Sequence, residues 1–373
     1  MIPYFLVFSS LFFFQLLFKR KVLIVAGTVL IALFFCFSYM NGSDWRQYEL
    51  VYEGKYQTGL LNMEPGFLLL LKTFRYLGVD FWHFFILIKL VCFYFFAIRL
   101  YSYLPNNYFN AMALFLSFFG LFLFIDCPLR NLIAVTIALY SIPHLLNRDF
   151  RKFLLIVIFA ALFHVSSLAL LLLYFLSNMN ASKGRLIFTY IAFYAALVVL
   201  SSMLKSGISG FFAGIPFIGS KIAIYFAEDN EATEGNIITL GLLLRSILYI
   251  ILVLNKDAII RKYGLTFFNQ VVIFFFLYRL SVTFPIFMRF TLLYSIFFTV
   301  GATMLFNIYS LRYRPVVYIL FYFYLFSNMY TLITSSYKYV PYTNYLEYLN
   351  EEKPSYNERF RYNFDQSPYN EKR

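Results

Sequence analysis

Apolar residues fill long stretches of this chain, and only short polar segments separate them. Runs of 18 or more apolar residues are typical of helices that cross a membrane, where every backbone polar group must find its partner within the helix. Strands would instead show alternation of apolar and polar positions over short segments, and no such alternation is present. The pattern predicts an all-α polytopic integral membrane protein with roughly 10–12 transmembrane helices, short and re-entrant helices included.

The predicted spans follow from these runs and from the polar segments between them. They are residues 2–18, 22–40, 81–104, 109–125, 131–146, 186–204, 237–254, 265–284, 285–307 and 315–334. Residues 66–78 are apolar too, but a helix of that length reaches only about 20 Å, less than the roughly 30 Å of the hydrocarbon core. We therefore expect an interfacial or re-entrant helix there.

Basic residues set the predicted orientation. The triplet Lys19-Arg20-Lys21 belongs in the cytoplasm by the positive-inside rule, which places residues 41–67 on the outer face. Residues 153–177 leave two interpretations open. A single span would place the later basic links outside, whereas two short helices turning near His164 place all of them inside. We prefer the two short helices; the alternative is a miscounted span elsewhere, at residues 66–78 in particular.

Two further polar segments are predicted to lie outside. Residues 205–236 contain glycines, one proline and an acidic cluster, so they are long enough to cover a site as a lid. Residues 335–373 form a polar, tyrosine-rich tail whose last twenty residues have the composition of disordered segments. The sequence thus predicts a single transmembrane domain, residues 1–334, followed by this tail.

Composition supports the membrane class and excludes other interpretations. Hydrophobic residues make up 61% of the 373 positions and charged residues 13%, about half of what a soluble domain carries. The net charge of +13 comes largely from the basic cytoplasmic links, so it does not indicate nucleic-acid binding. The three cysteines are scattered and predict neither a disulfide framework nor a metal site.

Ionisable side chains inside apolar runs are costly and mark functional sites in membrane proteins. Six such residues stand within or at the ends of predicted spans: Arg130, His164, Arg245, Arg279, Arg289 and Lys89. In the predicted topology all but Lys89 lie in the outer half of the membrane, beneath the segment that carries Asp44, Tyr48 and Glu64.

Each of these residues also has a plain structural interpretation. Arg130 and Arg289 fit snorkelling anchors at helix ends, and Arg245 fits a partner of a buried carboxylate or a lipid phosphate. A lone histidine such as His164 often serves only as a hydrogen-bonding group. Lys89 and Arg99 are expected only to snorkel or pack.

Taken together, the cations and carboxylates fit a lipid-linked pyrophosphate. The planar fork of arginine holds phosphate oxygens in pairs, and a carboxylate or histidine can take the proton of an attacking sugar hydroxyl. The sequence contains no nucleotide-phosphate loop, zinc ligand set or nucleophile elbow. A nucleotide donor is therefore not expected, and no metal or cofactor is predicted.

The order of several short motifs resembles the EpsG family of Wzy-like polysaccharide polymerases. The resemblance runs from about residue 41 to residue 173, with weaker similarity near residues 279–294 and 340–342. The motifs that carry it are Gly42-Ser43-Asp44 followed by Tyr48, then Glu64-Pro65-Gly66-Phe67, Arg130-Asn131-Leu132-Ile133-Ala134 and Phe163-His164-Val165-Ser166-Ser167-Leu168.

The resemblance implies an architecture similar to the C-type membrane glycosyltransferases (GT-C). It further implies a repeat-unit polymerase for O-antigen, capsule or exopolysaccharide, in the bacterial inner membrane with its site facing the periplasm. Donor and acceptor would be oligosaccharides on undecaprenyl pyrophosphate, with membrane lipids around the protein and a chain-length regulator as a further partner.

On this hypothesis the candidate residues take separate roles. Asp44 is the first choice for general base and His164 the second, while Glu64 positions the acceptor or the loop. The predicted binding residues for pyrophosphate and glycan are Arg130, Arg245, Arg279, Arg289 and Tyr48.

Two other functions remain open from the sequence. A flippase for the same lipid-linked units would distribute polar residues across both halves of the membrane and usually show an internal repeat. A membrane O-acyltransferase also uses an intramembrane histidine, which would have to be reachable from the cytoplasm.

Overall fold

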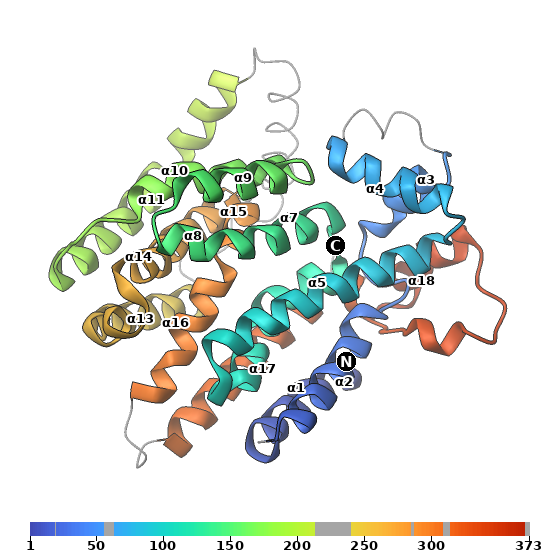
Figure 1. Ribbon diagram of the computed structural model, residues 1–373, viewed down its shortest axis with the longest axis horizontal. Helices are drawn as coiled ribbons and strands as arrows, with labels where there is room; N and C mark the ends of the chain where they lie inside the picture. Colours follow the sequence, from blue (N-terminus) through green and yellow to red (C-terminus); the bar gives the residue numbers. More distant parts are fainter. Residues whose placement is uncertain (19, 56–62, 213–239, 285–286, 309–313, 370–373) are drawn as a thin grey trace. The chain divides into compact units, whose positions relative to one another are not determined.

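The computed structural model describes residues 1–18, 20–55, 63–212, 240–284, 287–308 and 314–369 (Figure 1). Regular structure within these ranges is helical, and the only pairing of extended backbone in them is an isolated bridge between Ser38 and Asn344. Five helical segments are long and apolar enough to cross a membrane: Phe81–Tyr103, Pro105–Asp126, Leu129–Leu146, Lys256–Thr283 and Pro315–Thr334. The protein is an all-α polytopic membrane protein, as the hydrophobic runs predicted.

The described chain divides into two compact units. Unit 1 comprises Met1–Leu168 and Phe306–Arg373, and unit 2 comprises Ala169–Leu305. The apolar pattern of the sequence does not predict this division, because the helices of both units have similar apolar composition. Each unit is described by itself below.

Unit 1 is a bundle of long apolar helices, and polar side chains fix how they meet. Its first members are α1 (Ile2–Leu17), α2 (Lys21–Cys36), α5 (Phe81–Tyr103) and α6 (Tyr108–Phe115). The amide oxygen of Gln15 on α1 accepts the backbone N–H groups of Phe109 and Asn110 at the start of α6. Unpaired amides at a helix start are costly in an apolar surrounding, so this side chain anchors α1 to α6.

The central helices of unit 1 continue this pattern. After α6 the chain follows a π-helix, η3 (Leu116–Asp126), and Cys127 then takes a left-handed conformation before α7 (Leu129–Ala138). The C-terminal span α17 (Arg314–Thr334) joins α6 through Asn110, which contacts the hydroxyl groups of Tyr318 and Tyr322. These internal polar pairs specify which helices are neighbours where lipid-like side chains alone would not.

Residues 41–67, predicted as a polar segment, contain a helix of their own. This helix, α3 (Trp45–Tyr52), buries Trp45, Tyr48 and Glu49. It is followed by α4 (Pro65–Tyr76). The 12 residues of α4 span about 18 Å, which is shorter than the hydrocarbon core, as predicted for residues 66–78.

The break predicted near His164 is confirmed. Helix α9 (Phe150–Ala161) ends before it, and the short turn η5 (Val165–Leu168) follows and packs back against α9. The backbone N–H of His164 donates to the Ala160 carbonyl, and the Ser167 N–H donates to the His164 carbonyl. The 12 residues of α9 are too few for one continuous crossing.

Unit 2 is also built from helices, some long and some short. They are α10 (Ala169–Leu176), α11 (Lys183–Phe212), α13 (Leu240–Leu254), α14 (Lys256–Thr283), α15 (Met288–Leu293) and α16 (Ser295–Ile308), whose last residues belong to unit 1. Helices α11, α13 and α14 pack together, with the Tyr190 and Tyr249 rings stacked at 4.2 Å. The predicted lid begins inside α11; its remaining part, with the acidic cluster, lies outside the described residues.

The C-terminal tail is ordered over a region where its composition suggested disorder. It forms η8 (Tyr337–Tyr339), η9 (Tyr345–Tyr348) and α18 (Tyr356–Gln366). A capping box of Ser355 and Glu358 starts α18, and the Arg359 guanidinium pairs with the buried Glu49 carboxylate of α3. A polar helix is stable here because it docks on α3, which composition does not reveal.

This ion pair predicts a stability difference between two arginines of one helix. Replacing Arg359 by alanine leaves the Glu49 carboxylate, 3% exposed, without its partner and should lower the free energy of unfolding by about 3–5 kcal/mol. Arg361→Ala, on the exposed side of α18, should change it by less than about 0.5 kcal/mol. Thermal unfolding of the purified protein in detergent measures both. Equal effects would contradict the docking of α18 on α3.

Candidate active site

Glu64 stands where α4 begins, and the residues after it explain its position. Pro65 takes the first turn of the helix, where its missing N–H is not needed. The Gly66 N–H donates to the Leu162 carbonyl at the end of α9, and a Cβ on Gly66 would lie 2.8 Å from that oxygen. Only glycine permits this approach, which brings the start of α4 to the break that carries His164.

Both oxygens of the Glu64 carboxylate are engaged. The Arg130 guanidinium of α7 donates to Oε2 at 2.9 Å, and His164 Nδ1 lies 3.1 Å from Oε1. The Val165 backbone N–H also donates to Oε1, at 3.4 Å. One carboxylate thus joins three elements of unit 1: α4, α7 and the turn after α9.

These partners determine the ionisation of Glu64. Burial alone would raise the pKa of the carboxyl group, but the hydrogen bond from His164 and the charge of Arg130 outweigh it and lower the pKa to about 2. At neutral pH the group is a carboxylate whose lone pairs are used by its neighbours. It is therefore suited to positioning Arg130 and His164 and poorly suited to accepting a proton.

The network continues from Arg130 into the segment before α4. Arg130 is hydrogen-bonded to the hydroxyl of Tyr48, and that hydroxyl donates to Asp44 Oδ2 at 3.4 Å. Burial raises the pKa of Tyr48, so it remains a phenol. The predicted residues Asp44, Tyr48, Arg130, Glu64 and His164 thus form one hydrogen-bonded chain.

The backbone around Asp44 is held by Asp126 and Lys338, neither of which was predicted as a site residue. Gly42 has a φ of +82°, and a Cβ there would lie 2.6 Å from the Asp126 Cα. The Asp126 carboxylate accepts from the Ser43 N–H at 2.8 Å and from the Ser43 hydroxyl at 3.0 Å, and its other oxygen pairs with Lys338 Nζ at 3.1 Å.

The sequence does contain a feature that could have indicated Asp126 as a site residue, because this carboxylate ends a long apolar run shortly before Arg130. Its partner Lys338 lies 212 residues later, so the ion pair itself is invisible in the sequence.

The three other predicted arginines lie in unit 2. Arg279 of α14 is 3% exposed, donates to the Thr283 hydroxyl at 3.0 Å and lies 4.3 Å from the Tyr194 ring centroid. No carboxylate is paired with it among the described residues. Arg245 of α13 donates to the Tyr278 hydroxyl and covers the same ring, and Arg289 lies near the start of α15, which packs on α14.

Lys89, the sixth ionisable residue of the spans, lies apart from this network. It is fully buried on α5, donates to the Ser38 hydroxyl at 2.7 Å and lies 5.2 Å from the Phe85 ring centroid. These contacts fit the packing role predicted for it. In the part of the chain that the structure covers, no three His, Cys, Asp or Glu side chains come together as metal ligands would.

Comparison with known proteins gives one match. The model of a family described as the EpsG family matches residues 21–345. Neither the curated proteins nor the solved structures include a match to the chain. The matched range includes every predicted site residue and ends before α18.

The lowered pKa of Glu64 predicts a pH-dependent stability. Because the folded-state pKa of about 2 lies below the ordinary 4.5, the carboxylate contributes stability that is present above pH 4.5 and lost as the pH falls toward 2. At pH 7, Glu64→Gln should lower the free energy of unfolding by about 2–3 kcal/mol, and this deficit should shrink on approaching pH 3.

Unfolding midpoints of the wild type and Glu64→Gln at pH 7, 5, 4 and 3 measure this effect. Glu53→Gln is the control, because the Glu53 carboxylate pairs with Lys55 on the surface and should cost less than about 1 kcal/mol at pH 7. A deficit for Glu64→Gln that stayed constant down to pH 3 would show that its carboxylate charge is not what stabilises the site.

Proposed function

This chain belongs to the EpsG family, which implies a polysaccharide polymerase-type function, and we propose that it joins lipid-linked oligosaccharide repeat units. The proposed donor is an oligosaccharide on undecaprenyl pyrophosphate, and the acceptor is the terminal sugar of a second lipid-linked unit. The proposed site is the Asp44–His164 network of unit 1, facing the outside of the bacterial plasma membrane.

The observation that supports this proposal is the hydrogen-bonded chain from Asp44 to His164. It places a carboxylate that is part exposed, an arginine and an oriented imidazole within one network. In the proposed reaction an acceptor hydroxyl forms the new bond to the anomeric carbon of the donor, and the bond from that carbon to pyrophosphate breaks. The hydroxyl proton passes to a base, and the lipid pyrophosphate leaves with the electron pair.

The contacts assign distinct roles within this scheme. Asp44, part exposed at the edge of the network, remains the first choice for the base. Glu64 holds His164 through Nδ1, so that in the neutral ring Nε2 carries the lone pair, which makes His164 the second choice. Glu64 itself is assigned to positioning.

Charge balance supports a role for the arginines of unit 2. The unit 1 network contains two carboxylates against the one guanidinium of Arg130 and the imidazole of His164. Arg279 is a buried cation with no paired carboxylate among the described residues, so it is well suited to bind an anion. On this ground we propose that Arg279 binds an anionic group of the substrate. Arg245 and Arg289 stay candidates from the sequence pattern.

Substitutions in the unit 1 network test the proposal in cells. Arg130→Ala and Asp44→Asn should each reduce polymer by about 10²-fold or more, leaving single repeat units on their lipid at the outer face. Arg75→Ala, an exposed arginine of α4, should leave the polysaccharide ladder unchanged. The ladder is separated by size on a gel, with protein levels matched by immunoblot.

The same experiment separates the alternative functions. Repeat units that accumulate on the cytoplasmic side would indicate a flippase instead. An intact ladder that lacks only acetyl groups would indicate an acyltransferase. His164→Gln compared with Asp44→Asn separates the two candidate bases, because only the loss of the base should abolish the pH dependence of the residual rate.

A second pair of variants tests the role given to unit 2. Arg279→Leu replaces the buried cation by an apolar side chain and should reduce polymer by about 10-fold or more through weaker binding of the donor. Arg261→Leu, on the exposed part of α14, is the matched control and should have no effect. Normal polymer from Arg279→Leu at normal protein level would remove Arg279 from the site.

A further inference from the structure

An apolar groove of about 430 Å³ lies in unit 1 between α4, α5, α7 and α9. Its walls are built almost entirely from aliphatic and aromatic side chains. The Thr136 hydroxyl donates to the Leu132 carbonyl of its own helix, so this hydrogen bond is not directed at a ligand in the groove. The lining residues are Leu70, Ile88, Val91, Cys92, Phe95, Ile133, Thr136, Ile137, Tyr140, Ile156, Phe159 and Phe163.

The lining of the groove adjoins the candidate active site in sequence along α7 and at the turn after α9. On α7, Ile133 and Ile137 line it, and Arg130 precedes Ile133 by three residues, so the guanidinium stands at the head of the same helix face. On the opposite wall the last lining residue is Phe163, directly followed by His164. Leu70 of α4 lines the groove on the helix that Glu64 begins.

The shape of this groove favours a ligand with an anionic head and an apolar chain. From Ile133 to Tyr140 it follows α7 and the 3-10 turn after it for about 10 Å. Val91 and Phe159 are 43% and 53% exposed, so its side wall opens toward the surrounding lipid. A chain can therefore enter from the bilayer while its head stays at Arg130 and His164.

We propose that this groove holds the first isoprenoid units of the lipid-linked donor, with its pyrophosphate at Arg130. The inference rests on the proposed function and adds the binding site of the lipid chain. Inside a bilayer an apolar chain gains little from leaving lipid, so the groove contributes through close packing and through the fixed distance to the head. It thereby selects a chain that carries pyrophosphate at its end over an ordinary lipid.

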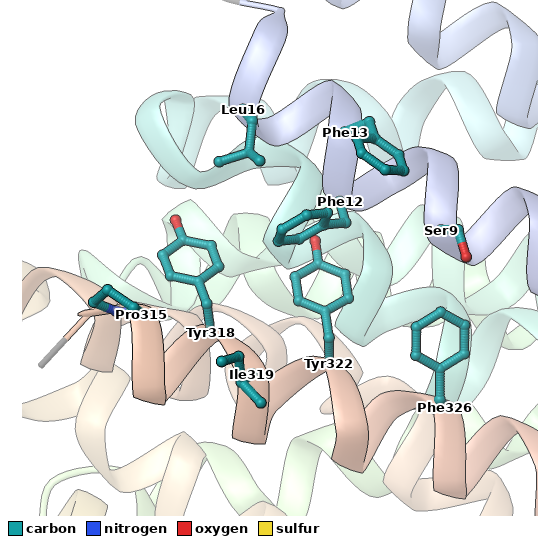
Figure 2. A pocket seen from close by; sticks show the side chains of 9 residues that line it. All are labelled: Ser9, Phe12, Phe13, Leu16, Pro315, Tyr318, Ile319, Tyr322 and Phe326. Carbon is teal, nitrogen blue, oxygen red and sulfur yellow. The ribbon is translucent and has the colours of Figure 1, made fainter.

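A larger groove elsewhere in unit 1 does not meet these conditions. It has a volume of about 800 Å³ and lies between α1 and α17, where the Phe12 and Tyr322 rings lie against each other (Figure 2). None of its nine lining residues carries a charge, and none adjoins in sequence a residue of the Asp44–His164 network. It offers packing for any lipid chain and supports no specific ligand.

Groove-filling variants test the proposal with two donors. Ile137→Trp should fill the groove, whereas Leu155→Trp adds the same side chain at a position of α9 that is 67% exposed and does not line it. Each protein is reconstituted in phosphatidylethanolamine–phosphatidylglycerol vesicles. One donor has the full polyprenyl chain and the other a short alkyl chain on the same glycosyl pyrophosphate.

Ile137→Trp should raise the KM for the long-chain donor by about 10-fold and leave kcat/KM for the short-chain donor unchanged. The short-chain rate also shows that the variant is folded. Equal losses with both donors, or no loss with either, would overturn the proposal, and Leu155→Trp should match the wild type throughout.

A binding experiment separates this inference from the proposed function. A polyprenyl pyrophosphate without sugar, carrying a photoreactive group on its first isoprene unit, is crosslinked to the wild type and the site mapped by mass spectrometry. Label on α7 and α9 that polyprenyl pyrophosphate displaces and phosphatidylglycerol does not is the expected result. Label displaced equally by phosphatidylglycerol would reduce the groove to a general lipid crevice.

The two failures are then distinct. Specific label in the groove, with no polymer formed from either donor, would leave the lipid site standing and overturn the polymerase. Normal polymerisation without label in the groove would support the polymerase and overturn the lipid site.

Discussion

The Glu64 carboxylate, with Arg130 on one oxygen and His164 on the other, fixes the geometry of the whole candidate site. A carboxylate in this half-buried position is costly unless it is paired and hydrogen-bonded, and here both conditions are met. The same contacts tie α4, α7 and the turn after α9 together. Removing this charge would leave Arg130 and His164 in place in the sequence but without the group that aligns them.

A second set of ion pairs attaches the segment with Asp44 to the tail. Asp126 binds Ser43 and Lys338, and Glu49 binds Arg359, so the C-terminal residues hold both ends of the stretch that carries Asp44 and Tyr48. In each pair the carboxylate is almost fully buried, which makes the loss of either cation expensive. The tail is therefore part of the framework of the site, although α18 lies beyond the range that the family model matches.

The two units differ in the charges that they offer to the proposed reaction. Unit 1 contributes a network in which cations and carboxylates nearly cancel, which suits proton transfer and orientation. Unit 2 contributes the buried Arg279 and the half-buried Arg245, whose guanidinium groups lie against tyrosine rings, which suits binding of an anion. The apolar groove of unit 1 is where we propose that the lipid chain of the donor lies.

The sequence by itself determined the membrane class, most helix positions, the break at His164 and the residues of the network, because apolar runs and misplaced charges are local features. It did not determine that α18 is ordered, that Asp126 meets Lys338, or that Glu64 uses both oxygens to align Arg130 and His164. Those facts depend on contacts between residues from 66 to more than 300 positions apart, which only the packing of the helices brings together. The sequence does not distinguish one carboxylate in a polar segment from another. The partners that the carboxylate meets in the folded protein determine whether it accepts a proton or holds its neighbours in place.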